Sequence, residues 1–214
     1  MQRVKNTPQA ICKRLFDLCL ATTAIILFLP LWITVPIAII LDSGLPVFFF
    51  QERAGQYGRS FRIIKFRTMV KDAEDYPEGV FTHKEDPRIT RVGKWLRKLS
   101  LDELPQLFNV LRGEMSIVGP RPTLLYQIEK YDARQKKRLL VKPGITGWAQ
   151  INGRNLLTWP ERIELDVWYV ENWSLWLDLQ IIIRTPIIVF KQQGIYGERK
   201  KDPIAEYPQK RLPS

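Results

Sequence analysis

The sequence is poor in the residues that build metal centres and disulfide frameworks: its 214 residues include two cysteines and one histidine. Cys12 and Cys19 lie seven residues apart in one predicted helix, too far along its axis to pair, which fits a reducing, cytoplasmic-side location. The lone His83 lies in the polar stretch FTHKEDPRIT. These observations argue against a disulfide-stapled fold, a structural zinc site and a nucleophilic triad built on histidine.

Acidic residues are also scarce relative to basic ones, 22 against 33, which gives a formal net charge of +11. Such an excess implies an anionic partner, and three classes fit: nucleic acid, an acidic membrane surface or a phosphorylated small molecule. The sequence contains no recognised nucleic-acid-binding motif, internal repeat or low-complexity tract. Its length fits one domain with room for an appendage.

Charged residues are absent from residues 18–41, a run long enough to cross a bilayer, since a spanning helix needs ~20 apolar residues. Basic residues predominate on both flanks, and the positive-inside rule therefore favours the cytoplasm for both. Pro30 and Pro36 each remove a helical hydrogen bond. We predict a re-entrant membrane helix–break–helix over residues 1–42 with its break at Pro30. A single ordinary span remains the alternative, because transmembrane helices tolerate proline.

Residues 43–197 are predicted to form a small globular domain on the cytoplasmic side, followed by a polar tail over 198–214. Its pattern indicates a strand, a glycine-rich turn and a second strand over 48–69, a loop over 71–90, and helices over 89–100 and 124–141. The expected fold class is therefore α+β. The tryptophan-rich residues 165–190 suit either the core or an amphipathic helix lying in the membrane interface, and the pattern leaves both open.

The stretch LSLDELPQLFNVLRG places two adjacent carboxylates at the head of an apolar stripe. Ser100 followed by Glu103 fits a capping box, in which each side chain satisfies a free backbone N–H. Asp102 and Glu103 also suit the dipole of a first helical turn, and Gly113 is a natural terminator. On periodicity alone, an ordinary helix start is the favoured interpretation of the acidic pair.

Basic residues at fixed positions suggest phosphate chemistry near this pair. Lys65 and Arg67 alternate along a predicted strand and so point to one face. Arginine forks match phosphate oxygens better than mobile lysines do. Any one of these cations alone suits a solvated surface charge. Beside a carboxylate pair they favour a phosphate site made of Lys65, Arg97, Arg121 and Arg154.

Four segments together resemble the monotopic phosphoglycosyl transferases, the bacterial sugar transferase family: KFRTM, LSLDELPQLFNVLRGEMSIVGPRP, KPGITGWAQINGRN and LDVWYVEN. They occur in the family's order. The resemblance implies transfer of a sugar-1-phosphate from a UDP-sugar to a polyprenyl phosphate such as undecaprenyl phosphate, with release of UMP. Such a reaction starts a membrane glycan (exopolysaccharide, O-antigen, capsule or glycoprotein glycan) at the cytoplasmic face of the bacterial inner membrane. The length suggests the minimal catalytic form.

The resemblance also implies roles for individual residues. Asp102 matches the nucleophile that attacks the β-phosphorus, above a helix N-terminus that helps hold the extra charge. Glu103 matches the residue associated with the required Mg²⁺. The phosphate clamps match Lys65, Arg97, Arg121 and Arg154.

One position departs from the family pattern. The family's membrane break is often a serine–proline pair, whereas this chain has Leu29 before Pro30. Thr34 is the hydroxyl that could satisfy a freed carbonyl in place of the serine.

A second class of function is a membrane-tethered basic protein without activity that recruits nucleic acid or anionic lipid. This hypothesis explains the charge and the apolar segment, but not an acidic pair beside four placed cations. Release of UMP would exclude it. Under the transferase hypothesis the partners are the UDP-sugar, the polyprenyl phosphate and membrane lipid, without nucleic acid, and with a homodimer left open. No residue pattern names the sugar.

Overall fold

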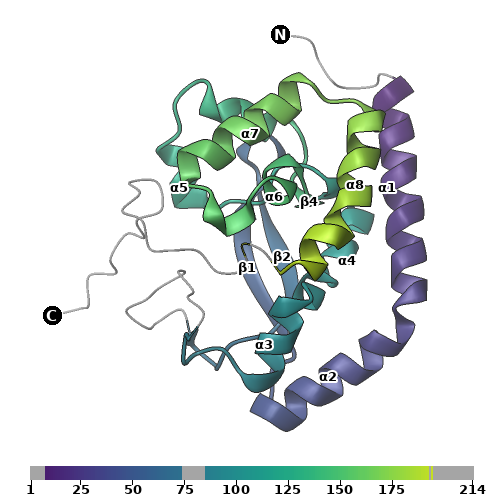
Figure 1. The fold of residues 1–214 in the computed structure, drawn as a ribbon, viewed down its shortest axis with the longest axis vertical. Helices are drawn as coiled ribbons and strands as arrows, with labels where there is room; N and C mark the ends of the chain where they lie inside the picture. Colours follow the sequence, from purple (N-terminus) through teal and green to yellow (C-terminus); the bar gives the residue numbers. More distant parts are fainter. Residues whose placement is uncertain (1–7, 74–84, 193, 195–214) are drawn as a thin grey trace, which may run out of the picture.

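A computed structural model describes residues 8–73, 85–192 and 194 of the chain. The predicted polar tail and most of the predicted loop over 71–90 lie outside the described residues. The fold is α+β, as expected (Figure 1). Its strands pair as β1 Phe48–Ala54 with β2 Ser60–Phe66, and β3 Ser116–Val118 with β4 Gly144–Thr146. Its helices are α1 Pro8–Leu27, α2 Leu29–Ser43, α3 Arg91–Lys98, α4 Gln106–Arg112, α5 Leu125–Glu129, α6 Trp148–Ile151, α7 Trp159–Glu171 and α8 Leu175–Phe190.

The predicted helix–break–helix is confirmed as a bent pair. α1 ends at Leu27, α2 begins at Leu29, and the two axes meet at 62°. Pro30 lies in the first turn of α2, where its missing N–H costs no hydrogen bond. The hydroxyl of Thr34 donates to the carbonyl of Pro30 at 3.0 Å. Among the described helices, none is long and apolar enough to cross a membrane alone, whereas this bent pair meets both criteria together.

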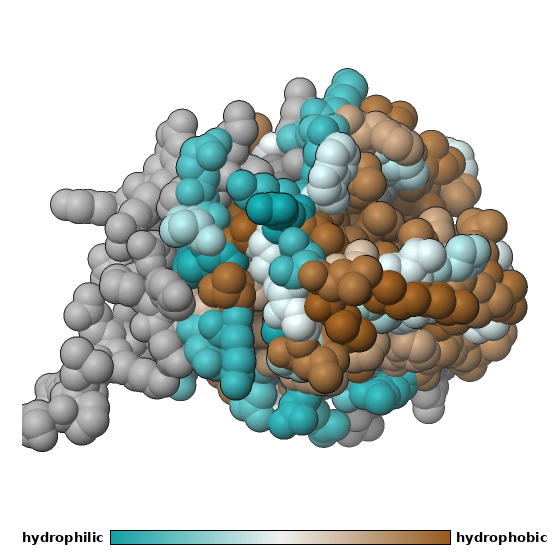
Figure 2. All heavy atoms as spheres, turned by 90° about the horizontal axis from the view of Figure 1, so that it is seen from below, coloured by the Kyte–Doolittle hydropathy of each residue, from teal (hydrophilic) through white to brown (hydrophobic). Residues whose placement is uncertain are grey.

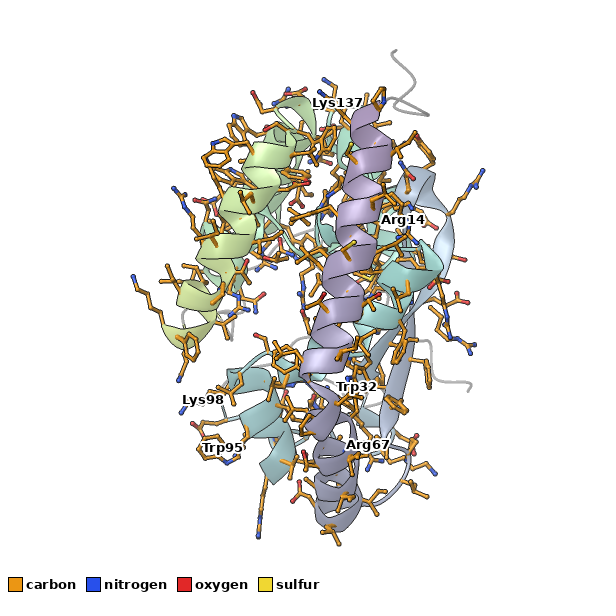
Figure 3. The ribbon with its side chains drawn as sticks, turned by 90° about the vertical axis from the view of Figure 1, so that its right-hand side faces the viewer. Arg14, Trp32, Arg67, Trp95, Lys98 and Lys137 are labelled. Carbon is orange, nitrogen blue, oxygen red and sulfur yellow. The ribbon has the colours of Figure 1, made fainter. Side chains whose placement is uncertain are left out.

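Helix α1 is held to the globular part by polar contacts as well as by packing. It runs beside α8 in two views (Figures 1 and 3). The Arg14 guanidinium donates to the carbonyls of Val110 and Leu111 at the end of α4, at 2.6 and 3.0 Å. Such a contact satisfies the free carbonyls of a helix end and suits its dipole. Asp17 accepts from the Ser116 hydroxyl, 3.0 Å away.

The antiparallel hairpin β1–β2 places Lys65 beside α4. Tyr57 and Gly58 close the turn with positive φ values of 59° and 75°, a conformation that glycine adopts at little cost. The side chain of Asn109 in α4 accepts from the Ile64 N–H at 3.1 Å and donates to the Arg62 carbonyl at 2.8 Å. This amide therefore fixes α4 against β2.

The parallel pair β3–β4 brings two glycine-rich segments into close contact. A Cβ added at Gly144 would lie 2.1 Å from the Gly119 nitrogen, so only glycine fits there. The loop that follows β3 carries Arg121, and the segment that follows β4 leads to α6. The pair therefore holds the Arg121 loop next to α6.

Two sequence interpretations are tested by the packing. The expected helix over 124–141 is wrong: it breaks into α5 and a 3₁₀ helix at Gln135–Leu140. The cause is a reciprocal bond in which Asp132 and Gln135 each accept from the other's backbone N–H, which starts a new turn. The segment over 165–190 contributes to the core through Tyr169, which is buried, but it also leaves Trp176 65% exposed. A position in the membrane interface stays a prediction.

Large apolar side chains remain exposed along one side of the molecule. Seen from the α2 end, hydrophobic residues gather over the side that carries α1 and α2 (Figure 2). Soluble monomers rarely expose contiguous patches of this kind. The exposed apolar residues on helices α1, α2 and α8 include Ile11, Leu15, Ile26, Leu27, Leu29, Ile33, Ile37, Leu41, Trp176, Ile183, Ile187 and Phe190.

Candidate active site

The acidic pair does not begin a helix with a capping box, so that prediction is wrong. Ser100 is left-handed, with φ of 56°, and makes no side-chain cap. Asp102 lies in a 3₁₀ turn, Leu101–Glu103, and α4 begins only at Gln106, so the expected helix N-terminus beneath Asp102 is replaced by this turn. The predicted terminator Gly113 is confirmed, with φ of 81°.

The capping box fails because other partners take both of its side chains. The Glu103 carboxylate accepts from Lys65 at 2.8 Å and from Arg121 at 2.6 and 3.3 Å. The Ser100 hydroxyl accepts from the Arg154 guanidinium at 3.0 Å. Charged partners from distant segments therefore outcompete the local backbone, as expected from the strength of charge-assisted bonds.

The remaining predicted cation, Arg97, is also positioned by a hydroxyl. It lies in the last turn of α3, and its Nε donates to the Thr68 hydroxyl at 2.8 Å. The sequence placed Arg67 on the same strand face as Lys65, but the Arg67 side chain binds different partners. Its guanidinium donates to the carbonyls of Ser43 and Gly44 at 2.8 and 2.6 Å, at the end of α2.

All six predicted site residues line one cavity of about 630 Å³. This volume lies within the range of small-molecule sites, ~300–1,000 Å³. The wall is built by the β1–β2 hairpin, the α3–α4 connection, the Arg121 loop and the α6–α7 region. The structure thus brings together, from segments far apart in the chain, Lys65, Arg97, Asp102, Glu103, Arg121 and Arg154. Pro30, the predicted membrane break, lies apart from them in α2.

The two adjacent carboxyl groups have opposite pKa shifts. Burial raises the pKa of Asp102, and the neighbouring Glu103 charge adds to this, while Lys65 opposes it. For Glu103, burial also acts upward, but the charges and hydrogen bonds of Arg121 and Lys65 outweigh it and hold the pKa well below its usual range. Glu103 is therefore the fixed anion, and Asp102 is the more basic carboxylate of the pair.

Two of the cations beside the pair, Lys65 and Arg154, are partly desolvated. Burial lowers the pKa of Lys65, with Glu103 opposing the shift. Burial also lowers the pKa of Arg154, and the like charge of Arg121 adds to the effect. Desolvated cations bind an incoming anion more strongly than hydrated ones do.

The donor set fits Mg²⁺. Mg²⁺ prefers hard oxygen ligands and is usually held by one or two carboxylates together with substrate phosphates. Among the described residues no cluster of three or more His, Cys, Asp or Glu is found, so a dedicated protein cage for a metal is not built there. Within the described residues, Glu103 Oε2 accepts a single long hydrogen bond, 3.3 Å from Arg121, and retains capacity to coordinate.

Sequence reasoning missed several residues of the cavity wall. Thr68 and Ser100 position the cations, and each follows or precedes a predicted site residue closely in sequence. Gln150 and Asp166 also line the cavity. Gln150 precedes Arg154 by four residues in a segment already singled out, and that proximity was the available signal.

Comparison with known proteins agrees with this geometry. The family model described as "Bacterial sugar transferase" matches residues 8–192. The chain belongs to the bacterial sugar transferase family. The predicted family is thereby confirmed, and the match includes the α1–α2 pair as well as the six predicted site residues of the cavity.

Individual relatives support the same assignment. The sugar transferase EpsL of Bacillus subtilis is 49% identical over 192 residues, covering 86% of this chain and 90% of that protein. The undecaprenyl-phosphate glucose phosphotransferase of Komagataeibacter xylinus is 48% identical, covering 81% of this chain but 35% of that protein. The undecaprenyl-phosphate galactose phosphotransferase of Salmonella typhimurium is 39% identical, covering 86% and 41%. The chain thus spans less than half of these two longer transferases.

Proposed function

We propose that this protein transfers a sugar-1-phosphate from a UDP-sugar to polyprenyl phosphate, such as undecaprenyl phosphate. The observation that carries the proposal is the position of Asp102 and Glu103 in the wall of one cavity together with the four predicted cations. Relatives that bear the names of undecaprenyl-phosphate glucose and galactose phosphotransferases support the same class of substrates.

In the first step, the Asp102 carboxylate attacks the β-phosphorus of the donor. A P–O bond forms to the aspartate, and the bond from the β-phosphorus to the bridging oxygen breaks, so that UMP leaves with its electron pair. The raised pKa of Asp102 supports this role, because a more basic carboxylate is the better nucleophile. Among the described residues, no hydrogen bond occupies the Asp102 carboxylate.

The surrounding cations hold the diphosphate during this step. The acidic turn is contacted by three of them: Lys65 and Arg121 pair with Glu103, and Arg154 donates to Ser100. Preorganised charges of this kind stabilise the phosphoryl transition state without further rearrangement. When bound through Glu103 and the donor's phosphates, Mg²⁺ would neutralise part of the diphosphate charge.

In the second step, a phosphate oxygen of the polyprenyl phosphate attacks the same phosphorus, and the bond to Asp102 breaks. The aspartate returns to its carboxylate form, and the product is a polyprenyl-diphosphate sugar. Dividing the displacement in this way avoids bringing two large anions together at once.

Delivery of such an acceptor requires contact with a membrane. The exposed apolar side chains of α1, α2 and α8 support a position in which these helices lie in one leaflet. The 62° bend between α1 and α2 supports a re-entrant course, with the cavity on the cytoplasmic face. The product would then start a glycan at the bacterial inner membrane.

A donor panel tests the proposal. Purified protein in nanodiscs is given undecaprenyl phosphate, Mg²⁺ and one of several UDP-sugars, and UMP and the lipid product are measured. We expect UMP and lipid-linked sugar in equal amounts for at least one donor. A protein that binds anionic lipid but releases no UMP with any donor would instead be a binding protein.

A further inference from the structure

Gln150 is a buried amide in the cavity wall whose hydrogen-bonding capacity is unused. It lies in α6, is 9% exposed and lines the cavity. Among the described residues, neither its Nε2 nor its Oε1 finds a hydrogen-bond partner. Buried amides are nearly always paired, because an unpaired one destabilises the folded state. An unpaired amide in a substrate cavity therefore requires an explanation.

The backbone around Gln150 leaves room for this amide. A Cβ added at Gly147 would lie 2.7 Å from Gln150 Oε1 and 2.2 Å from the Gly119 carbonyl oxygen. The Gln150 amide thus lies against the glycine segment that precedes α6, and this segment contacts the loop leading to Arg121. The arrangement brings a neutral hydrogen-bonding group close to the loop of a phosphate-binding cation.

Asp166 supplies a second unused polar atom in the same wall. It is 1% exposed, its Oδ2 accepts from Arg138 at 2.5 Å, and its Oδ1 has no hydrogen-bond partner in the part of the chain that the structure describes. Arg138 also donates to the Arg121 carbonyl at 3.1 Å, and it thereby links Asp166 to the Arg121 loop. The cavity therefore holds an amide that can donate and accept, and a carboxylate oxygen that can accept.

We propose that Gln150 and Asp166 form a subsite for the uncharged part of the donor, a group with both hydrogen-bond donors and acceptors. This inference rests on the proposed function. The four cations suit the diphosphate, whereas the rest of a UDP-sugar is neutral and carries hydroxyls and an imide edge. Two sources offer the chemistry of this subsite: the uracil and ribose, or the hydroxyl and amide groups of the sugar.

The test replaces Gln150 with methionine, which has a similar shape but no amide. Binding of UDP and of the UDP-sugar that supports turnover is measured by calorimetry in nanodiscs. We expect Gln150→Met to bind the UDP-sugar about tenfold more weakly, equivalent to ~1.4 kcal/mol. An equal loss for UDP places the subsite at the nucleoside, and a loss confined to the UDP-sugar places it at the sugar.

A matched control is available in Gln106, a buried glutamine whose Nε2 also lacks a partner but which is not among the described residues of the cavity wall. Gln106→Met should bind both ligands as the wild type does. A purely structural amide would behave differently from the proposed one: its removal would lower the melting temperature. Removal of an unpaired amide should leave that temperature unchanged or raise it.

Three results would overturn the subsite. They are unchanged affinity of Gln150→Met for both ligands, an equal loss of affinity in Gln106→Met, and a lowered melting temperature of ligand-free Gln150→Met. Failure of the proposed function is distinguishable, because the wild type itself would then bind neither UDP nor any UDP-sugar.

Discussion

Two carboxylates, the buried Asp178 and the partly buried Glu103, accept from lysine at similar distances but have different surroundings. Asp178 is 0% exposed and accepts from Lys13 at 2.7 Å, Trp173 at 3.1 Å and Tyr169 at 2.6 Å. These bonds join α1, α7 and α8. Glu103 accepts from Lys65 and Arg121, but it lines the cavity, and Asp102 stands beside it.

The two carboxylates differ in how fully their oxygens are hydrogen-bonded. At Asp178, both carboxylate oxygens accept hydrogen bonds, from Tyr169 on one oxygen and from Lys13 and Trp173 on the other, so the centre stabilises the fold and has no capacity for a ligand. At Glu103, the same kind of ion pair holds cations in a cavity, beside a carboxylate with a raised pKa. An ion pair that lines a cavity can contact a substrate and take part in a reaction. An ion pair whose atoms are all bonded within the protein can only stabilise the fold.

The largest effect on stability is expected at the Asp178 centre. Asp178→Asn removes the charge that Lys13 and Tyr169 face, and breaking a buried pair costs about 3 kcal/mol. Thermal unfolding in detergent should show a clear loss, while turnover per folded molecule stays near the wild-type value. Glu164→Gln, which breaks an exposed pair with Arg134, is the control and should unfold as the wild type does. Normal stability of Asp178→Asn would remove the distinction between the two centres.

At Glu103, a substitution should affect turnover more than stability. Glu103→Gln should lower turnover at least a hundredfold, about 2.7 kcal/mol of barrier, because Lys65 and Arg121 lose their fixed anion. Its melting temperature should fall, but less than that of Asp178→Asn, because solvent in the cavity still reaches the Lys65 and Arg121 side chains that lose their partner. The Mg²⁺ concentration that gives half-maximal rate should rise. An unchanged Mg²⁺ titration would place the metal role on another residue.

A smaller effect is expected for Arg154, a cation that is hydrogen-bonded to Ser100 and not to Glu103. Arg154→Ala removes the bond to Ser100 and one cation of the cavity. We expect the KM for the donor to rise about tenfold, or ~1.4 kcal/mol, with stability changed by no more than ~0.5 kcal/mol. Arg134→Ala, a surface arginine outside the cavity, should leave the KM unchanged. Unfolding of Arg154→Ala would show that this arginine is structural.

The smallest expected effect is a shift in the pH profile. If the Asp102 carboxylate is the nucleophile, kcat/KM falls as the pH drops through its raised pKa. Lys65 lowers that pKa and Glu103 raises it. Lys65→Met should therefore move the acid limb to higher pH, and Glu103→Gln should move it to lower pH. Shifts of both variants in one direction would contradict this assignment.

The sequence predicts features that depend on local chemistry. Proline chemistry predicted the break near Pro30, and glycines predicted the hairpin turn. The selection of Lys65, Arg97, Arg121 and Arg154 also anticipated their shared cavity. These features follow from backbone restrictions and from residue type.

The sequence failed where distant side chains outcompete the local backbone. The pattern from Ser100 to Glu103 has the spacing of a capping box, but Arg154 binds the serine and Lys65 the glutamate from 54 and 38 residues away. A single sequence does not reveal such partners. The Asp178 centre was missed for the same reason, since Lys13 lies 165 residues from it.

The central claim is that Asp102 carries the sugar phosphate during the reaction, and intact-protein mass spectrometry tests it directly. Wild-type protein is mixed with the active UDP-sugar and Mg²⁺ without acceptor. We expect a mass increase of one sugar phosphate per chain, an equal amount of UMP, and loss of the adduct when polyprenyl phosphate is added. Asp102→Asn should show neither adduct nor UMP burst. An adduct on Asp102→Asn, or turnover of more than about a tenth of the wild-type rate by that variant, a difference of only ~1.4 kcal/mol, would contradict the account.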